Sequence, residues 1–163
     1  MSVNKYAPHV LVLPEDDANT QIANGFQLAL PGQNFRKLQI LPEAGGWTRV
    51  RDSFLSDHVA EMERNPNRYM VLIIDLDGRP ERPQSIHDLI PPTLADKVFI
   101  VGAARTPEEL KDLGSYETIG RALAEDCAAG TVAIWGHELL RHNQTEIVRM
   151  RERLCPILFG IVG

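Results

Sequence analysis

The chain has 163 residues, 44% of them hydrophobic and 24% charged, and this suits one globular domain with a sizeable core. We therefore expect residues 1–163 to form a single domain. The net charge of −5 argues against a broad, nonspecific grip on nucleic acid, which needs clustered lysine and arginine. No basic-then-apolar leader opens the sequence, and no apolar run is long enough to cross a bilayer. The expectation is a cytoplasmic protein with no membrane contact.

The first part of the chain alternates short apolar runs with helical patterns. Asp16 or Asp17 is placed to cap the first helix, and Pro31-Gly32 stops it. A second helix follows Gly45-Gly46 and ends at Asn65-Pro66. The expected elements are, in order, a strand at 10–13, a helix at 18–30, a strand at 35–41 and a helix at about 48–64.

The central feature of the sequence is an apolar run that leads directly into two carboxylates. Residues 69–74 are apolar and rich in β-branched side chains, which predicts a strand buried on both faces. Asp75 and Asp77 follow, and Gly78 and Pro80 end the strand. In extended backbone, residues two apart leave the same face. Two such carboxylates repel each other unless a cation or a proton lies between them.

The second part of the chain continues the alternation of strands and helices. Thr106-Pro107 resembles a helix start, Asn143 is placed to cap another helix, and residues 131–135 fit either a short strand or the start of a helix. The other expected elements are a short helix at 84–89, a strand at 98–101, a helix at about 116–128, a helix ending at 154 and a late edge strand at 156–159. This order predicts an α/β fold with three layers, α/β/α, around a mainly parallel central sheet.

Charged residues follow three of the predicted strands. Glu15 with Asp16, Asp75 with Asp77, and Arg105 each come directly after a strand. Because the carboxyl ends of parallel strands share one edge of the sheet, which is the usual ligand crevice, these side chains are expected to gather there. This convergence is the strongest functional signal in the sequence.

Carboxylates at such an edge indicate a divalent metal and a phosphate-bearing substrate. Mg²⁺, or Mn²⁺ in its place, takes one or two protein carboxylates and completes its shell with water and phosphate. Asp75 and Asp77 fit that role, and Glu15 is placed to bind a second metal or to act as a base. Arg105, and Arg79 or Arg82, are candidate phosphate contacts.

The run Leu11–Glu15 and the later run Ile73–Gly78 resemble the two motifs of the Toprim fold, which occurs in topoisomerases, primases and OLD-type nucleases. The resemblance covers roughly the first two-thirds of the chain and is an analogy at the level of the fold. It implies that Glu15, Asp75 and Asp77 bind Mg²⁺ for phosphoryl chemistry on nucleic acid. It also implies a stand-alone nuclease or a nuclease-like subunit that serves a protein partner, such as an ATPase.

Two other interpretations remain open. The acids after the first strand also resemble those of a response-regulator receiver domain, in which Asp75 would accept a phosphoryl group and Thr106 would match the switch hydroxyl. Receivers carry a lysine after the fifth strand, and residues 131–142 contain none. The third interpretation is a non-catalytic Toprim-like interaction module.

Overall fold

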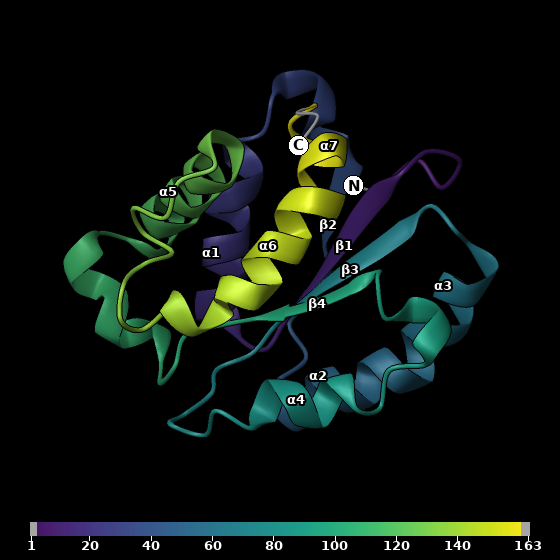
Figure 1. The fold of residues 1–163 in the computed structure, drawn as a ribbon, viewed down its shortest axis with the longest axis horizontal. Helices are drawn as coiled ribbons and strands as arrows, with labels where there is room; N and C mark the ends of the chain where they lie inside the picture. Colours follow the sequence, from purple (N-terminus) through teal and green to yellow (C-terminus); the bar gives the residue numbers. More distant parts are fainter. Residues whose placement is uncertain (1–2, 161–163) are drawn as a thin grey trace.

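The protein is built on a four-stranded sheet in which all strands run parallel (Figure 1). The computed structural model describes residues 3–160. The order of the strands across the sheet is β2-β1-β3-β4. The strands are β1 (His9–Pro14), β2 (Leu38–Ile40), β3 (Arg68–Ile73) and β4 (Val98–Val101).

Helices cover both faces of this sheet, so the predicted three-layer α/β/α architecture is confirmed (Figure 1). One layer contains α1 (Asp17–Leu28), α5 (Tyr116–Ala129), α6 (Gln144–Arg153) and α7 (Cys155–Leu158). The other contains α2 (Trp47–Ser53), α3 (Val59–Arg64) and α4 (Arg82–His87). A π-helical turn, Phe54–His58, joins α2 to α3. The helix predicted at 48–64 is therefore one continuous helix whose middle turn is π-helical.

The strands feed two separate cores because their side chains alternate between the faces. In β1, Val10 and Val12 pack in the core beneath α1 and α5, whereas Leu11 and Leu13 pack in the core beneath α2 and α3. All six residues of β1 are buried. A strand buried on both faces is what a continuous apolar run predicts.

Helix α1 begins where the sequence predicts. The carboxylate of Asp16 accepts a hydrogen bond from the Asn19 backbone N–H at 3.0 Å, so Asp16 is the N-cap. The cap fixes the first turn of α1 directly after the end of β1. It thereby fixes the position of Asn19, whose side chain is buried at the edge of the sheet.

Two predicted strands differ from the structure. The strand expected at 35–41 is shorter, because Gly32–Lys37 forms a 3₁₀ helix before β2. The Asn34 side chain holds this 3₁₀ helix in place, because its Nδ2 donates to the Leu158 carbonyl at 3.0 Å.

The late edge strand expected at 156–159 is wrong. Residues Cys155–Leu158 form helix α7, and Pro156 lies in its first turn, where the missing N–H costs nothing. The edge of β4 is also closed to another strand. The Glu146 carboxylate on α6 accepts from the Ile100 backbone N–H at 2.7 Å.

Other elements agree more closely with expectation. The strand at 98–101 has the predicted bounds, and α5 matches the helix expected at 116–128 to within a residue. Helix α4 begins two residues before the expected 84. The expected helix after Thr106 is a 3₁₀ helix, Pro107–Leu113. Residues 131–135 form neither strand nor helix: 131–132 are irregular and 133–135 form a turn.

Candidate functional site

The strand order places a topological switch point at the carboxyl edge of the sheet. The chain leaves β1 toward β2 on one side and later places β3 on the other side of β1. In parallel α/β sheets, such a reversal opens a ligand crevice between the two central strands. Glu15 follows β1 and Asp75 lies two residues after β3, so both acids lie at the carboxyl edge of the two central strands, which we call the rim.

Glu15 and Asp75 are in direct contact at the rim. The Glu15 carboxylate oxygen Oε2 accepts a hydrogen bond from the Asp75 backbone N–H at 2.6 Å. Burial raises the pKa of Glu15 above its ordinary value, and the nearby carboxylates of Asp16 and Asp77 raise it further, although the bond from Asp75 opposes this shift. A carboxyl group with a raised pKa is suited to proton transfer near neutral pH.

Asp75 is a buried acid, with 6% of its surface exposed. Its Oδ1 accepts from Nδ2 of Asn19 at 3.1 Å. Burial raises the pKa of Asp75 to about 8, and the charges of Asp16 and Glu15 act in the same direction, while the Asn19 bond opposes them. At neutral pH this carboxyl therefore favours its protonated form in the absence of an added cation.

We expect the substitution Asp75→Asn to make the protein more stable at pH 8 to 9 and to change its stability little near pH 4. Between the ordinary value of 3.8 and about 8, the folded state holds a proton on Asp75 that the unfolded state lacks. Wild-type stability must therefore fall as pH rises through this window. An amide at position 75 keeps the bond from Asn19 and carries no charge. Urea unfolding from pH 4 to 9 measures the difference, and equal pH profiles for the two proteins would contradict a buried, protonated Asp75.

Asp77 faces a different partner from Asp75. Strand β3 ends at Ile73, and Asp77 adopts a left-handed backbone conformation with φ of 50°. Its Oδ2 accepts from Arg82 Nη1 at 2.8 Å. The same-face geometry expected of an extended Asp75–Asp77 segment is therefore not formed, because the chain turns at Asp77.

Arg82 is the cation that lies at the rim. Its Nη1 also donates to the Asp75 carbonyl at 2.9 Å, and its guanidinium lies over the Trp47 ring, 4.9 Å from the centroid. Arg79 is exposed in the turn before α4. The Arg105 side chain is 60% exposed, and its Nε lies 3.6 Å from Oε2 of Glu109. Its carbonyl accepts from the Asp77 N–H, which places its backbone, but not its side chain, at the rim.

Sequence reasoning did not find Trp47. It begins α2 directly after Gly45-Gly46, and the Gly45 N–H donates to the Glu15 carbonyl at 2.8 Å. This loop follows β2, so the same carboxyl-edge rule that predicts the other rim residues applies to it. The signal in the sequence that could have identified Trp47 is its position directly after a glycine pair that follows a predicted strand.

The donor chemistry of the rim fits Mg²⁺, but its present arrangement is not a finished metal site. Carboxylate oxygens are the ligands that Mg²⁺ prefers, and one or two suffice beside water and phosphate. Among residues 3–160, however, no three Asp, Glu, His or Cys side chains converge as a metal cluster. The contacts account for this, because Asp77 pairs with Arg82 and Asp75 is held by Asn19.

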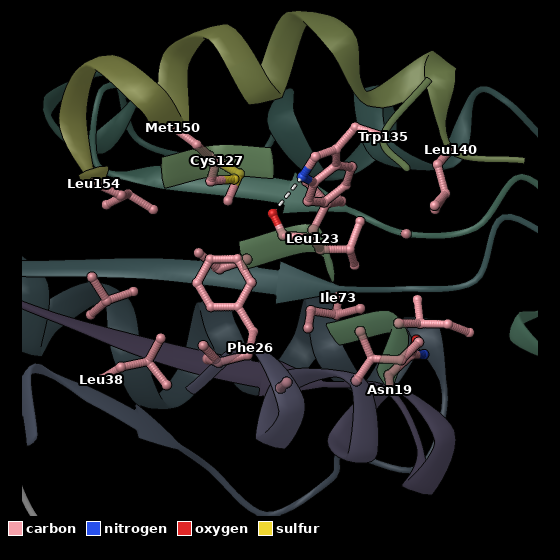
Figure 2. Close-up of a pocket in the computed structure, with 18 of the residues that line it drawn as sticks. Asn19, Phe26, Leu38, Ile73, Leu123, Cys127, Trp135, Leu140, Met150 and Leu154 are labelled. Atoms are coloured by element: carbon pink, nitrogen blue, oxygen red, sulfur yellow. Dashed lines mark hydrogen bonds between the residues drawn. The ribbon is translucent and has the colours of Figure 1, made fainter. Parts of the chain in front are cut away.

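An apolar cavity of about 80 Å³ lies behind the rim, between the sheet and the layer formed by α1, α5 and α6 (Figure 2). Phe26, Leu123 and Trp135 are among its walls, and the Trp135 indole N–H donates to the Leu123 carbonyl at 3.1 Å. The lining includes no acidic or basic side chain, and Asn19 is its link to the rim. The rim, not the cavity, therefore carries the candidate chemistry.

Fold and rim together define an α/β protein with acidic residues at the switch point of a parallel sheet. The chain has no significant match among protein-family models, curated proteins or solved structures. None of the helices within residues 3–160 is long and apolar enough to cross a membrane. The chemistry of the rim is therefore the basis on which a function can be proposed.

Proposed function

We propose that this chain is a Toprim-like protein that performs Mg²⁺-dependent phosphoryl chemistry, with phosphodiester hydrolysis of nucleic acid as the reaction. The observation that carries the proposal is the contact between Glu15 and Asp75 at the switch point of the sheet. The spacing of these acids and Asp77 along the chain, each after a buried strand, also agrees with the Toprim motifs. The same proposal includes a role for the chain as the nuclease-like subunit of a larger system, with an ATPase or other subunit as its partner.

Each rim residue has a role in this proposal. Asp75 and Asp77 would hold the metal ion, which would neutralise phosphate charge and make a bound water more acidic. Glu15, whose pKa is raised by burial, would accept a proton from the attacking water. Arg79 is exposed near the rim and is available to substrate phosphates, whereas the Arg105 side chain, which lies against Glu109, would have to leave that partner to reach them. The metal would compensate for the net charge of −5, which otherwise repels nucleic acid.

We expect calorimetry to detect Mg²⁺ or Mn²⁺ binding to the wild type, and Asp75→Asn and Asp77→Asn each to weaken it by about tenfold or more, as loss of a charged ligand does. Glu63→Gln is the matched control, because Glu63 is an exposed acid on α3, away from the rim. Cleavage of single- and double-stranded DNA and RNA should require the metal and disappear in both rim variants. Absence of binding at millimolar metal would reject the catalytic proposal for the free protein.

The receiver-like function is the second candidate, and the strand order β2-β1-β3-β4 favours it because receivers begin with the same order. The burial of Asp75 opposes it, since a phospho-acceptor must meet its phosphodonor. Labelling by acetyl phosphate that Asp75→Asn abolishes would establish this function. A folded protein with neither labelling nor metal binding, but with a binding partner, would establish the non-catalytic module.

A further inference from the structure

The apolar cavity behind the rim is larger than the gaps that close packing leaves in a protein core. Its volume is about 80 Å³, whereas few voids in a protein interior exceed the size of one water molecule. All four strands contribute side chains to one side of the cavity, and α1, α5, α6 and α7 contribute to the other (Figure 2). A space of this size between the two layers can hold several carbon atoms.

The walls of the cavity offer almost nothing to a water molecule. The indole N–H of Trp135 is already bound to the Leu123 carbonyl at 3.1 Å. The Cys155 thiol, also at the wall, donates to the Cys127 carbonyl at 3.7 Å. Apart from these groups and Asn19, the lining side chains are hydrocarbon, thioether or thiol. Because a buried water needs two to four polar partners, the cavity favours an apolar occupant.

Asn19 gives one end of the cavity a polar group. Figure 2 shows it at the end of the lining opposite Leu38. Asn19 is 1% exposed, and its Nδ2 donates to Asp75 Oδ1 at 3.1 Å. No hydrogen bond within residues 3–160 uses its Oδ1. An amide oxygen removed from water is unfavourable unless it accepts a hydrogen bond, so this atom is suited to a donor on a ligand.

The charges around Asn19 restrict the head group of such a ligand. The Asp16 and Asp75 carboxyl groups both accept hydrogen bonds from Asn19, and Glu15 accepts from the Asp75 N–H. A carboxylate head group would be repelled by these acids. An ammonium group would lose its hydration at so buried a position. A hydroxyl donates a hydrogen bond and carries no charge, so it fits best.

Two half-buried aromatic rings provide a way into the cavity. Phe26 on α1 and Phe159, directly after α7, both line it. Their ring centroids lie 6.1 Å apart, with the ring planes tilted by 60°. Both residues are partly exposed, unlike most of the lining. Because exposed side chains change rotamer rapidly, these rings can open a path without movement of the sheet.

We propose that the cavity is a binding site for a small aliphatic alcohol of about three or four carbon atoms. A cavity of about 150 Å³ holds one benzene molecule, so about half that volume holds about half as many carbons. The chain fills the apolar space, and the hydroxyl donates to Asn19 Oδ1. This site is independent of the proposed phosphoryl chemistry and needs no metal ion.

NMR titration of the full chain with 1-butanol tests the site. We expect saturable shifts of the Asn19 side-chain amide and Trp135 indole signals, with a Kd of about 1 mM, which is ordinary for so few atoms. Butyrate has a chain of the same length and a carboxylate in place of the hydroxyl. It should bind at least about tenfold more weakly, because Asp16 and Asp75 border the site.

Ala23→Val tests the cavity itself, because Ala23 lies on α1 and lines the space. The added methyl groups occupy the place of the ligand chain, so 1-butanol should bind about tenfold more weakly or not at all. Ala60→Val is the matched control, since it makes the same change at an exposed position on α3, in the opposite layer. Its Kd should stay within about twofold of the wild type. Thermal melts identify any variant that is unfolded.

Asn19→Ala tests the contact with the hydroxyl. It should weaken 1-butanol binding about fivefold, as loss of one hydrogen bond does. Binding of xenon, which fills apolar cavities and has no donor, should stay within about twofold. If this variant unfolds, the comparison of 1-butanol with butyrate tests the same contact in the wild type.

The outcomes bear on the cavity alone, since none of these measurements uses a metal ion. Saturable 1-butanol binding that is weakened in Ala23→Val and is tighter than that of butyrate supports the site. No saturation up to about 50 mM, fifty times the expected Kd, overturns it and leaves the cavity as a packing void. Equal affinity for 1-butanol and butyrate, or an unchanged Kd in Asn19→Ala, overturns the role of Asn19 and with it the class of ligand.

Discussion

Replacing Gly120 by Ala is expected to lower the free energy of unfolding by about 3 kcal/mol, at the upper end of overpacking effects. Helices α1 and α5 cross with their backbones in contact. A Cβ at position 120 would lie 1.9 Å from the Ile22 carbonyl oxygen and 2.8 Å from the Phe26 nitrogen. Gly25 has the reciprocal position, because a Cβ there would lie 2.0 Å from the Glu117 oxygen. Backbone atoms cannot rotate away, so the helices must separate.

Separation of these helices would also affect the rim, since α1 carries Asn19, which holds Asp75. Urea unfolding measures the loss of stability. Gly32→Ala is the control, because a Cβ at position 32 meets nothing within 4 Å, and it should lie within about 0.5 kcal/mol of the wild type. A Gly120→Ala protein as stable as the wild type would show that the two helices do not pack backbone to backbone.

Local rules were sufficient to predict most of the architecture. The apolar, β-branched runs that form β1 and β4 are unambiguous, and Asp16 caps α1 because a short acceptor side chain precedes a helical pattern. The meeting of Glu15 with Asp75 was predictable because every parallel strand ends at the same edge. That inference needed only strand positions and direction.

The errors come from contacts between distant residues. Arg82 shares its pattern with Arg79, and only the left-handed turn at Asp77 brings it, rather than Arg79, to the carboxylate. Likewise, the apolar run at 156–159 suits a strand by composition. The edge of β4 is closed by Glu146, which lies on α6, a helix that begins more than forty residues after β4 ends. Periodicity contains no information on either contact.

Among the acidic residues, Asp126 is the one whose replacement by alanine is expected to lower the free energy of unfolding most, by about 4 kcal/mol. The reason is that several hydrogen-bond donors would lose a charged acceptor. The residue lies near the end of α5 and is 4% exposed. Its Oδ1 accepts from the Thr131 hydroxyl at 2.6 Å and the Ala133 N–H at 3.1 Å. Its Oδ2 accepts from the N–H groups of Ile134 and Trp135, at 2.6 and 3.1 Å.

These four bonds explain how residues 131–135 form an ordered turn without helix or strand. They also bring Trp135 into the core, where its ring lines the cavity of Figure 2. Asp126→Ala should therefore alter the near-ultraviolet circular dichroism of tryptophan as well as the urea midpoint. Glu125→Gln, an exposed neighbour on α5, is the control and should change neither. An unaltered midpoint in Asp126→Ala would contradict the bonds.

The pH dependence tests the same carboxylate independently, with a sign opposite to that of Asp75. Burial would raise the pKa of Asp126, but the bonds from Thr131, Ile134, Trp135 and Ala133 outweigh burial and hold it below the ordinary value. A depressed pKa contributes stability above the unfolded value and loses it as pH falls through the folded value. The stability difference between wild type and Asp126→Asn should therefore shrink below pH 4, whereas that for Asp75→Asn should grow from pH 4 to 8. Asp126 thus stabilises the fold as an anion, whereas Asp75 destabilises it unless a proton or cation is bound. This is expected of a residue whose role is in a functional site and not in the stability of the fold.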